Sequence, residues 1–241
     1  MGNRLDEHFA MCSTFKLPLA AVVLRMAERG KLRLDEAIPY SEKDMLSHAP
    51  VTRLHLAEGS MTVKALTEAT QTTSDNPAAN LLLRRLGGPA ALTAALRSMG
   101  ARTTRIDRME PEMNLVLPGE ERDTTTPRDM AQFVARLATG KILKRASREE
   151  LMAWMVATTT GDKRIRAGLP KGWRAGDKTG TATHDLMTDK INDVAVTWPP
   201  GRAPMVIAAY YDSSRRSTEI GDPDQAVLAE VGRIAAEWLG S

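Results

Sequence analysis

Ser13 and Lys16 lie three positions apart in a Ser-Thr-Phe-Lys segment near the start of the chain. A serine hydroxyl becomes an effective nucleophile when an adjacent base takes its proton. Residues three apart share one face of a helix, so the Lys16 amine is expected beside the Ser13 hydroxyl. The start of a helix also favours an oxyanion formed there. Taken alone, the pair fits equally well a helix start followed by a surface lysine.

Two further short motifs supply groups that suit the same chemistry. Ser74, Asp75 and Asn76 offer a second hydroxyl and a side-chain amide, although these residue types also cap helices. Lys178 opens a Lys-Thr-Gly segment that, alone, fits a lysine at a strand edge near a turn. From the composition of the chain, all three motifs together are expected by chance only about 0.0006 times. Their joint presence is therefore not explained by composition.

The elements that hold these motifs change character along the chain. The pattern is mainly helical up to about residue 159, and after residue 161 it indicates strands followed by an amphipathic helix. Thr62 is an expected N-cap for the helix that follows it. We expect helices over residues 13–30, 63–69, 77–86, 89–99, 127–139, 148–157 and 224–239, and strands over residues 178–181, 193–198 and 205–211.

This order of elements predicts an α+β fold, in which a helical body precedes a small antiparallel sheet backed by a terminal helix. We expect residues 13–159 to form a mainly helical domain with a long loop at about 108–123. Residues 1–12 and 160–241 are expected to form an incomplete α/β domain with a C-terminal helix. A long loop without periodicity inside a compact domain is usually functional.

The composition excludes several other kinds of protein. With 33 Lys+Arg and 30 Asp+Glu the net charge is +3, and no basic run of the kind that binds nucleic acid is present. No apolar run approaches the roughly 20 residues of a membrane span. The single cysteine, Cys12, excludes a disulfide within the chain and zinc sites built on paired cysteines. We expect no metal, nucleotide or other cofactor, no nucleic-acid partner and no membrane partner.

The three motifs, in this order, are those of class A β-lactamases and penicillin-binding proteins, and the chain resembles a class A serine β-lactamase over nearly all of its 241 residues. The segment from Arg108 to Asn114 resembles the start of that family's Ω-loop, and the segment from Glu121 to Thr125 resembles its end. Glu110 favours a lactamase over a penicillin-binding transpeptidase, because the lactamase adds a carboxylate that activates the deacylating water. The resemblance implies an all-helical domain plus an antiparallel sheet flanked by helices.

The resemblance also implies hydrolysis of the β-lactam amide of penicillins and cephalosporins through a serine acyl-enzyme. Ser13 attacks the carbonyl, and its proton passes either to Lys16 directly or to Glu110 through water. Ser74 relays a proton to the leaving nitrogen, and Glu110 activates the water that releases the product. The remaining implied residues form the oxyanion hole, bind the substrate or assist Glu110: Asn76, Asn114, Arg164, Lys178, Thr179, Gly180 and Thr181.

Some features of the chain depart from the family pattern. His48 stands where the family usually has an aromatic residue, and the link from Thr181 to Asn192 looks longer than usual. Family members also carry a signal peptide, a helix and two strands before the segment that matches Arg4, and we find none of these in the chain. We therefore expect the chain alone to be unstable or inactive unless those elements are supplied.

The resemblance implies a periplasmic or secreted enzyme with a small-molecule β-lactam substrate. A completed fold is expected to be a monomer, and an incomplete one is expected to associate through an exposed sheet edge. Two alternatives to an active lactamase remain open. One is a penicillin-binding DD-peptidase or esterase with the same Ser-Lys pair, and the other is an inactive truncated fragment or binding protein.

Overall fold

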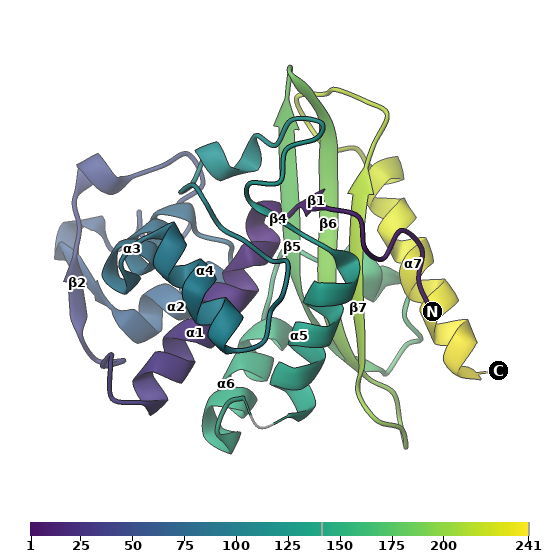
Figure 1. Ribbon diagram of the computed structural model, residues 1–241, viewed down its shortest axis with the longest axis horizontal. Helices are drawn as coiled ribbons and strands as arrows, with labels where there is room; N and C mark the ends of the chain where they lie inside the picture. Colours follow the sequence, from purple (N-terminus) through teal and green to yellow (C-terminus); the bar gives the residue numbers. More distant parts are fainter. Residues whose placement is uncertain (141, 241) are drawn as a thin grey trace.

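The computed structural model describes residues 1–140 and 142–240. A helical body, a three-stranded antiparallel sheet and a long terminal helix follow one another along the chain (Figure 1). The helices are α1 Lys16–Glu28, α2 Val63–Thr72, α3 Asn76–Leu86, α4 Pro89–Ser98, α5 Pro127–Thr139, α6 Arg145–Val156 and α7 Asp222–Gly240. The strands are β1 Phe9–Ala10, β2 Ala37–Pro39, β3 Ser60–Thr62, β4 Thr124–Thr125, β5 Arg174–His184, β6 Met187–Trp198 and β7 Met205–Asp212. Three of the 3₁₀ turns matter for the site: η1 Cys12–Phe15, η4 Glu112–Asn114 and η5 Ile165–Gly168.

The large sheet separates two packed layers. Its strands follow the order β5-β6-β7, and each is antiparallel to the next. Val194 and Val196 of β6 join the main core with the helical body, whereas Ala195 packs with Ile165 of η5 and Leu228 of α7. Successive side chains of a strand point to opposite faces, so β6 is covered on both sides. The sequence-based prediction of an α+β fold is therefore confirmed.

Helix α1 occupies the centre of the helical body. Its residues from Lys16 to Leu24 are all buried, and it contacts α2, α3, α4 and α6. A helix that is apolar on every side is stable only when other elements surround it. Burial of α1 places Lys16, its first residue, inside the protein. The interpretation of Lys16 as a surface lysine is therefore wrong.

Most helices begin and end close to the expected positions. Helix α5 matches the predicted range 127–139, α2 continues to Thr72, and α6 already begins at Arg145. Thr62 caps α2, because its side-chain oxygen accepts a hydrogen bond from the Ala65 N–H at 3.2 Å. These small differences are of the size expected at helix ends, where hydrogen bonding frays.

The strands β5 and β6 are longer than the sequence predicts. They pair out to His184 and Met187, so the expected long link between them is mostly strand and closes in a two-residue turn. Three polar residues of this segment, Asp189, Lys190 and Asn192, are buried through hydrogen bonds or ion pairs instead of apolar packing. Asp189, for example, is fully buried and accepts a hydrogen bond from the Ser217 N–H at 3.0 Å. Such a pattern carries no hydrophobic alternation, and the sequence therefore did not predict it.

Two short strand pairs were also not predicted, because pairs of two or three residues have no periodicity. β2 pairs with β3, and β1 pairs with β4. Beyond β1, the Met11 N–H donates to the Asp123 carbonyl oxygen at 3.0 Å. These contacts attach the segment before Ser13 to the end of the long loop.

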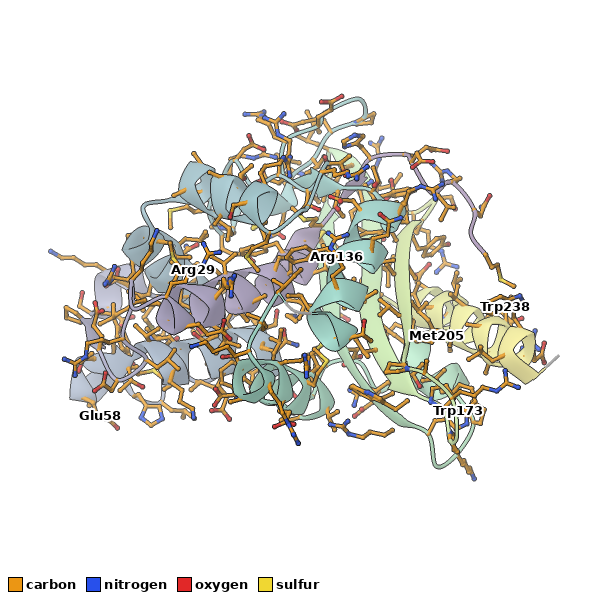
Figure 2. The ribbon with its side chains drawn as sticks, turned by 60° about the horizontal axis from the view of Figure 1, so that its bottom comes forward. Arg29, Glu58, Arg136, Trp173, Met205 and Trp238 are labelled. Atoms are coloured by element: carbon orange, nitrogen blue, oxygen red, sulfur yellow. The ribbon has the colours of Figure 1, made fainter. Side chains whose placement is uncertain are left out.

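The sheet has a free edge at β7, which pairs only with β6 among the described strands. A cavity of about 710 Å³ lies between β7, α7 and the first residues of the chain. Met205 of β7 and Trp238 of α7 both line it, and Figure 2 labels them at the sheet end of the molecule. Within the part of the chain that the structure describes, no helix is long and apolar enough to cross a membrane.

We expect Asp129→Ala to lower the free energy of unfolding by about 2–4 kcal/mol, because it leaves several buried donors unpaired. The nearly buried Asp129 carboxylate accepts hydrogen bonds from the backbone N–H groups of Arg102, Thr103 and Thr104 at 2.8–3.0 Å. Burial acts to raise the pKa of Asp129, but these donors outweigh it and lower that pKa. The stabilisation is therefore present above the unfolded pKa and is lost as the pH falls through the folded pKa.

Urea unfolding of the wild type and the Asp129→Ala variant at neutral pH measures this difference. Asp6→Ala is the control, because the exposed Asp6 carboxylate binds only the Arg128 side chain among the residues that the structure describes. We expect the control to keep the wild-type midpoint. Equal midpoints for the two variants would contradict a special role of Asp129.

Candidate active site

The three motifs meet where the helical body adjoins β5. Ser13 lies in η1, and Lys16 is the first residue of α1. The Lys16 Nζ donates a hydrogen bond to the Ser13 Oγ at 3.0 Å. The two side chains are therefore adjacent, as their spacing predicts, but on a 3₁₀ turn that leads into the α-helix.

The Lys16 amine lies among five oxygen atoms, of which the Ser13 Oγ is one. Lys16 is fully buried, and its Nζ donates to the Ser74 carbonyl oxygen at 2.8 Å and to the Asn76 Oδ1. The Glu110 Oε1 forms an ion pair with it at 3.1 Å. Burial lowers the pKa of Lys16, while the negative charge of Glu110 acts in the opposite direction. A lowered pKa brings this amine closer to the range in which it acts as a general base.

The Ser-Asp-Asn motif both caps a helix and supplies the site. The Asp75 Oδ1 accepts a hydrogen bond from the Ala78 N–H at 2.9 Å, so Asp75 is the N-cap of α3. Its neighbours Ser74 and Asn76 both contact Lys16. Ser74 has a φ of 62°, in the left-handed region. The motif therefore forms a helix cap and also places Ser74 and Asn76 beside Lys16.

Asp75 also fixes the loop at the rim of the site. Its Oδ2 accepts hydrogen bonds from the backbone N–H groups of Val51 and Thr52, both at 2.9 Å. His48, just before them, accepts the Asn76 N–H on its carbonyl oxygen at 3.0 Å. The rim loop and the start of α3 are therefore joined through one buried carboxylate.

Lys178 approaches the site from β5. It is fully buried, and its Nζ donates to the Ser74 Oγ at 3.0 Å. Burial lowers the pKa of Lys178 well below its usual value, and the nearby charge of Lys16 lowers it further. Because the Lys16 Nζ also donates to the Ser74 Oγ, at 3.3 Å, the hydroxyl lies between two amines. This arrangement suits proton transfer through Ser74.

Glu110 is held by two asparagines. Its side chain is buried, the Ser13 Oγ lies 3.5 Å from Glu110 Oε1, and the Asn114 Nδ2 donates to Glu110 Oε2. Asn80 fixes the backbone of Glu110 twice: its Nδ2 donates to the carbonyl oxygen at 2.8 Å, and its Oδ1 accepts the N–H at 2.9 Å. The role of Asn80 was not predicted from the sequence. Its position one helical turn after Asn76 is a signal that could have found it.

An ion pair closes the loop that carries Glu110. The Arg108 Nε lies 2.6 Å from the Asp123 Oδ2, and the fully buried Asp123 also accepts the backbone N–H groups of Asp107 and Arg108. The ion pair joins the two segments that resemble the start and the end of the family's Ω-loop, and we use that name for residues 108–123. Glu110 therefore lies in a loop whose two ends are joined by this ion pair.

The remaining candidates gather along β5. The Thr179 Oγ1 hydrogen-bonds the Thr160 Oγ1 at 2.6 Å. Arg164, almost fully buried, donates through Nη1 to the Gly180 carbonyl oxygen at 3.0 Å and through Nη2 to the Thr181 Oγ1 at 2.6 Å. A guanidinium and two threonine hydroxyls therefore lie along the same strand as Lys178.

We expect Gly180→Val to lower kcat/KM by about 100-fold or more, because a displacement of about 1 Å at a reacting centre has effects of this size. A Cβ atom at Gly180 would lie 2.6 Å from the Met11 carbonyl oxygen and 3.2 Å from the Thr14 backbone nitrogen. The substitution therefore pushes β5 away from η1, which carries Ser13. The control is Gly221→Ala, where the nearest atom to the added Cβ is Pro223 Cδ at an ordinary 3.4 Å. Steady-state hydrolysis of a chromogenic cephalosporin tests both, and wild-type rates for Gly180→Val would contradict the close approach.

The fold is that of a known class of enzyme. It matches a solved mutant of the last common ancestor of Gram-negative bacteria β-lactamase class A with a TM-score of 0.93 and 52% identity, over 100% of this chain and 88% of that chain. The described residues contain no group of three or more His, Cys, Asp or Glu side chains that could hold a metal ion. Fold and motifs together define a class A serine β-lactamase, an enzyme that hydrolyses β-lactams.

The chain belongs to the β-lactamase enzyme family, whose model matches residues 2–239. It is 49% identical over 241 residues to β-lactamase L2 from Stenotrophomonas maltophilia, and the match covers all of this chain and 77% of that protein. It is 42% identical over 240 residues to the carbapenem-hydrolyzing β-lactamase KPC from Klebsiella oxytoca, with 100% of this chain and 80% of that protein covered. The resemblance inferred from the three motifs is confirmed.

Proposed function

We propose that Ser13 is the nucleophile of this β-lactamase and that Lys16, Ser74 and Glu110 move the protons of its two chemical steps. One observation carries this proposal: the Ser13 Oγ has the Lys16 Nζ at 3.0 Å and the Glu110 Oε1 at 3.5 Å. A nucleophile needs a base within hydrogen-bonding reach, and that base needs a group that orients it. Lys16 and Glu110 also orient one another through their ion pair.

In the acylation step, Ser13 attacks the lactam carbonyl and Lys16 takes its proton directly, or Glu110 takes it through water. The lactam C–N bond then breaks, and Ser74 donates its hydroxyl proton to the leaving nitrogen. Lys16 and Lys178 both donate to the Ser74 Oγ. A proton lost by Ser74 is therefore replaced from an adjacent amine.

The oxyanion formed in acylation is assigned to the backbone N–H groups of Ser13 and Thr181. The close approach of Gly180 to Met11 and Thr14 supports this assignment, because it brings β5 against η1. The loss of one such donor typically lowers kcat by roughly 100- to 1,000-fold.

The substrate carboxylate is assigned to the cationic end of β5, with Lys178, Thr179 and Arg164 as its ligands. Lys178 and Arg164 are buried and donate to neutral oxygens among the described residues, so no hydrogen-bonded carboxylate of the protein competes there with the carboxylate of a substrate. The side-chain amide of Asn76 is assigned to the acylamide carbonyl of the substrate.

In the deacylation step, Glu110 accepts a proton from a water molecule that attacks the ester carbonyl of acyl-Ser13. Asn114 holds the Glu110 carboxylate through Oε2, and Asn80 fixes its backbone. The ester C–O bond breaks and Ser13 recovers its proton. Glu110 supplies the base for this water, and this role favours a β-lactamase over the DD-peptidase alternative.

Hydrolysis of a chromogenic cephalosporin by the purified chain, followed by rapid quenching and mass analysis, tests the assignment. We expect turnover and a transient adduct with the full mass of the substrate, mapped by peptide sequencing to Ser13. An adduct on another residue contradicts the assigned nucleophile. An adduct that forms but does not turn over favours the DD-peptidase alternative, and neither adduct nor turnover favours the inactive fragment.

We also propose that residues 13–159 act as a helical domain and residues 1–12 and 160–241 as an α/β domain, with the site at their junction.

The free edge of β7 and its adjacent 710 Å³ cavity support association through this edge when it is open, and a monomer when it is covered. A periplasmic or secreted location is proposed from the family. Size-exclusion chromatography at two concentrations tests the assembly, and a monomer with an open edge contradicts it.

A further inference from the structure

A cluster of four charged side chains lies behind the end of β5 that we assign to the substrate carboxylate. Arg164 directly precedes η5, and Arg166 lies within it. Asp177 lies on β5, and Asp193 lies on β6. Both aspartates are fully buried, and Arg164 is 5% exposed. The mechanism proposed above uses only Arg164. The other three side chains therefore have no assigned role.

Arg164 lacks a direct counter-charge. Its hydrogen bonds go to the carbonyl oxygens of Gly180 and Asn192 and to the Thr181 hydroxyl, which are all neutral, and its Nε has no partner among the described residues. A buried guanidinium without a negative charge nearby is strongly unfavourable. Asp193, followed by Asp177, is the carboxylate whose charge acts on Arg164 most strongly.

The two aspartates face the same side of the sheet. Asp193 pairs across the strands with Thr179, and Asp177 lies two residues from Thr179 on the same strand. Side chains in this diagonal relation lie on one face and reach one another. The charged groups that face the pair are Arg164 and Arg166 from the η5 segment, Asp162 before it and Lys178 from β5.

The hydrogen bonds of the pair are incomplete in a way that indicates a missing proton donor. The Asp193 Oδ2 accepts the Ile165 N–H at 3.1 Å, but its Oδ1 and both oxygens of Asp177 have no hydrogen-bond donor among the described residues. Arg166 approaches Asp177 at 3.3 Å without forming a hydrogen bond. A protonated carboxyl group is itself a donor, so one proton on the pair supplies a hydrogen bond between two acceptors.

Burial and mutual repulsion support the same conclusion. Burial raises the pKa of Asp177 to about 6, against the opposing charge of Arg166. Burial, and then the charge of Asp177, raises the pKa of Asp193 well above its usual value. Two buried carboxylates this close do not both ionise readily near neutral pH.

We propose that Asp177 and Asp193 hold one proton between them and present a single negative charge that positions Arg164 for the substrate carboxylate. This inference rests on the proposed function of Arg164. Asp193 also accepts a hydrogen bond from the N–H of Ile165, the residue after Arg164. The pair therefore positions Arg164 through the backbone as well as by charge. Asp177 and Asp193 are positioning residues, because they act on the substrate through Arg164.

The variants Asp177→Asn, Asp193→Asn and the double variant test the proposal. Each single substitution removes the shared proton but leaves one aspartate with its negative charge. The double substitution removes both the proton and the negative charge. We expect each single variant to keep KM for a carboxylate-bearing chromogenic cephalosporin within about threefold of the wild type. The double variant is expected to raise that KM by about 10- to 100-fold, with a smaller change in kcat.

Two comparisons separate positioning from general damage. The KM for the methyl ester of the same cephalosporin, which lacks the carboxylate, is expected to change by less than about threefold in the double variant. The matched control is Asp162→Asn with Asp177→Asn, which also replaces two carboxylates but leaves Asp193 beside Arg164. We expect this control to keep the wild-type KM. Equal effects of the two double variants, an equal effect on the ester, or a full effect of either single substitution would overturn the proposal.

Infrared spectroscopy supplies a readout that needs neither substrate nor the double variant. We expect the carbonyl-stretch band of a protonated carboxyl group in the wild type at neutral pH and its loss in both single variants. Absence of the band from the wild type would overturn the shared proton. Failure of the proposed function is distinguishable, because it is seen as absence of turnover in the wild type while the band remains.

Discussion

Glu110→Gln is expected to give an enzyme that acylates and then stalls. The amide cannot accept a proton from water, so deacylation falls by about 10²- to 10⁴-fold, the usual contribution of a general base. Glutamine keeps the size of the side chain and the contact with Asn114, and Asn80 holds the backbone as before. The adduct on Ser13 therefore accumulates and is detected by intact mass.

The control for this substitution is Glu112→Gln, two residues further along the same loop. Glu112 is exposed and begins η4, so its carboxylate is expected to have no effect on turnover. The rate of the acylation burst in Glu110→Gln also distinguishes the two candidate bases. An unchanged burst favours Lys16, which lies closer to the Ser13 Oγ, and a slowed burst favours Glu110. Full turnover by Glu110→Gln would contradict its role.

Ser13→Ala is expected to lower kcat by roughly 10⁴- to 10⁶-fold, as removal of a catalytic serine does in other serine hydrolases. No adduct is expected, because among the described residues Ser13 carries the hydroxyl that contacts both Lys16 and Glu110. The fold should tolerate the change, since Lys16 keeps its contacts with Ser74, Asn76 and Glu110. Stopped-flow absorbance and intact mass measure the loss.

Ser98→Ala is the matched control for this second prediction. Ser98 is exposed on α4, and its Oγ donates to the Ala95 carbonyl oxygen at 2.7 Å. It is expected to behave as the wild type in rate and adduct formation. Residual hydrolysis by Ser13→Ala at more than about 1% of the wild-type rate would identify another nucleophile.

The part of the site that the sequence predicts is the part built from short spacings. Ser13 and Lys16 are three residues apart, and Glu110 and Asn114 are four apart, and each pair is in contact in the structure. Ser74 and Asn76 flank a helix cap, so their chemistry is also readable in one segment. The family motifs then join these segments, which local patterns alone cannot do.

The part that the sequence does not predict depends on contacts between distant strands and loops. Asn80 and Glu110 are thirty positions apart, and no periodicity relates a helix residue to a loop residue. Strands β5 and β6 extend further than predicted, because β6 buries the polar residues Asp189, Lys190 and Asn192 and so shows no apolar pattern there. Asp193 is a strand residue whose importance becomes visible only when the backbone of Ile165 and the charge of Arg164 are placed beside it.

The junction at Asp75 has a consequence for how the effect of one mutation spreads. A single carboxylate holds the backbone of Val51 and Thr52 and the first turn of α3, and the His48 carbonyl oxygen receives the Asn76 N–H. Loss of this carboxylate removes the bonds to the loop and the helix cap at the same time. A substitution at position 75 is therefore felt in two segments of the chain at once, although it changes only one side chain.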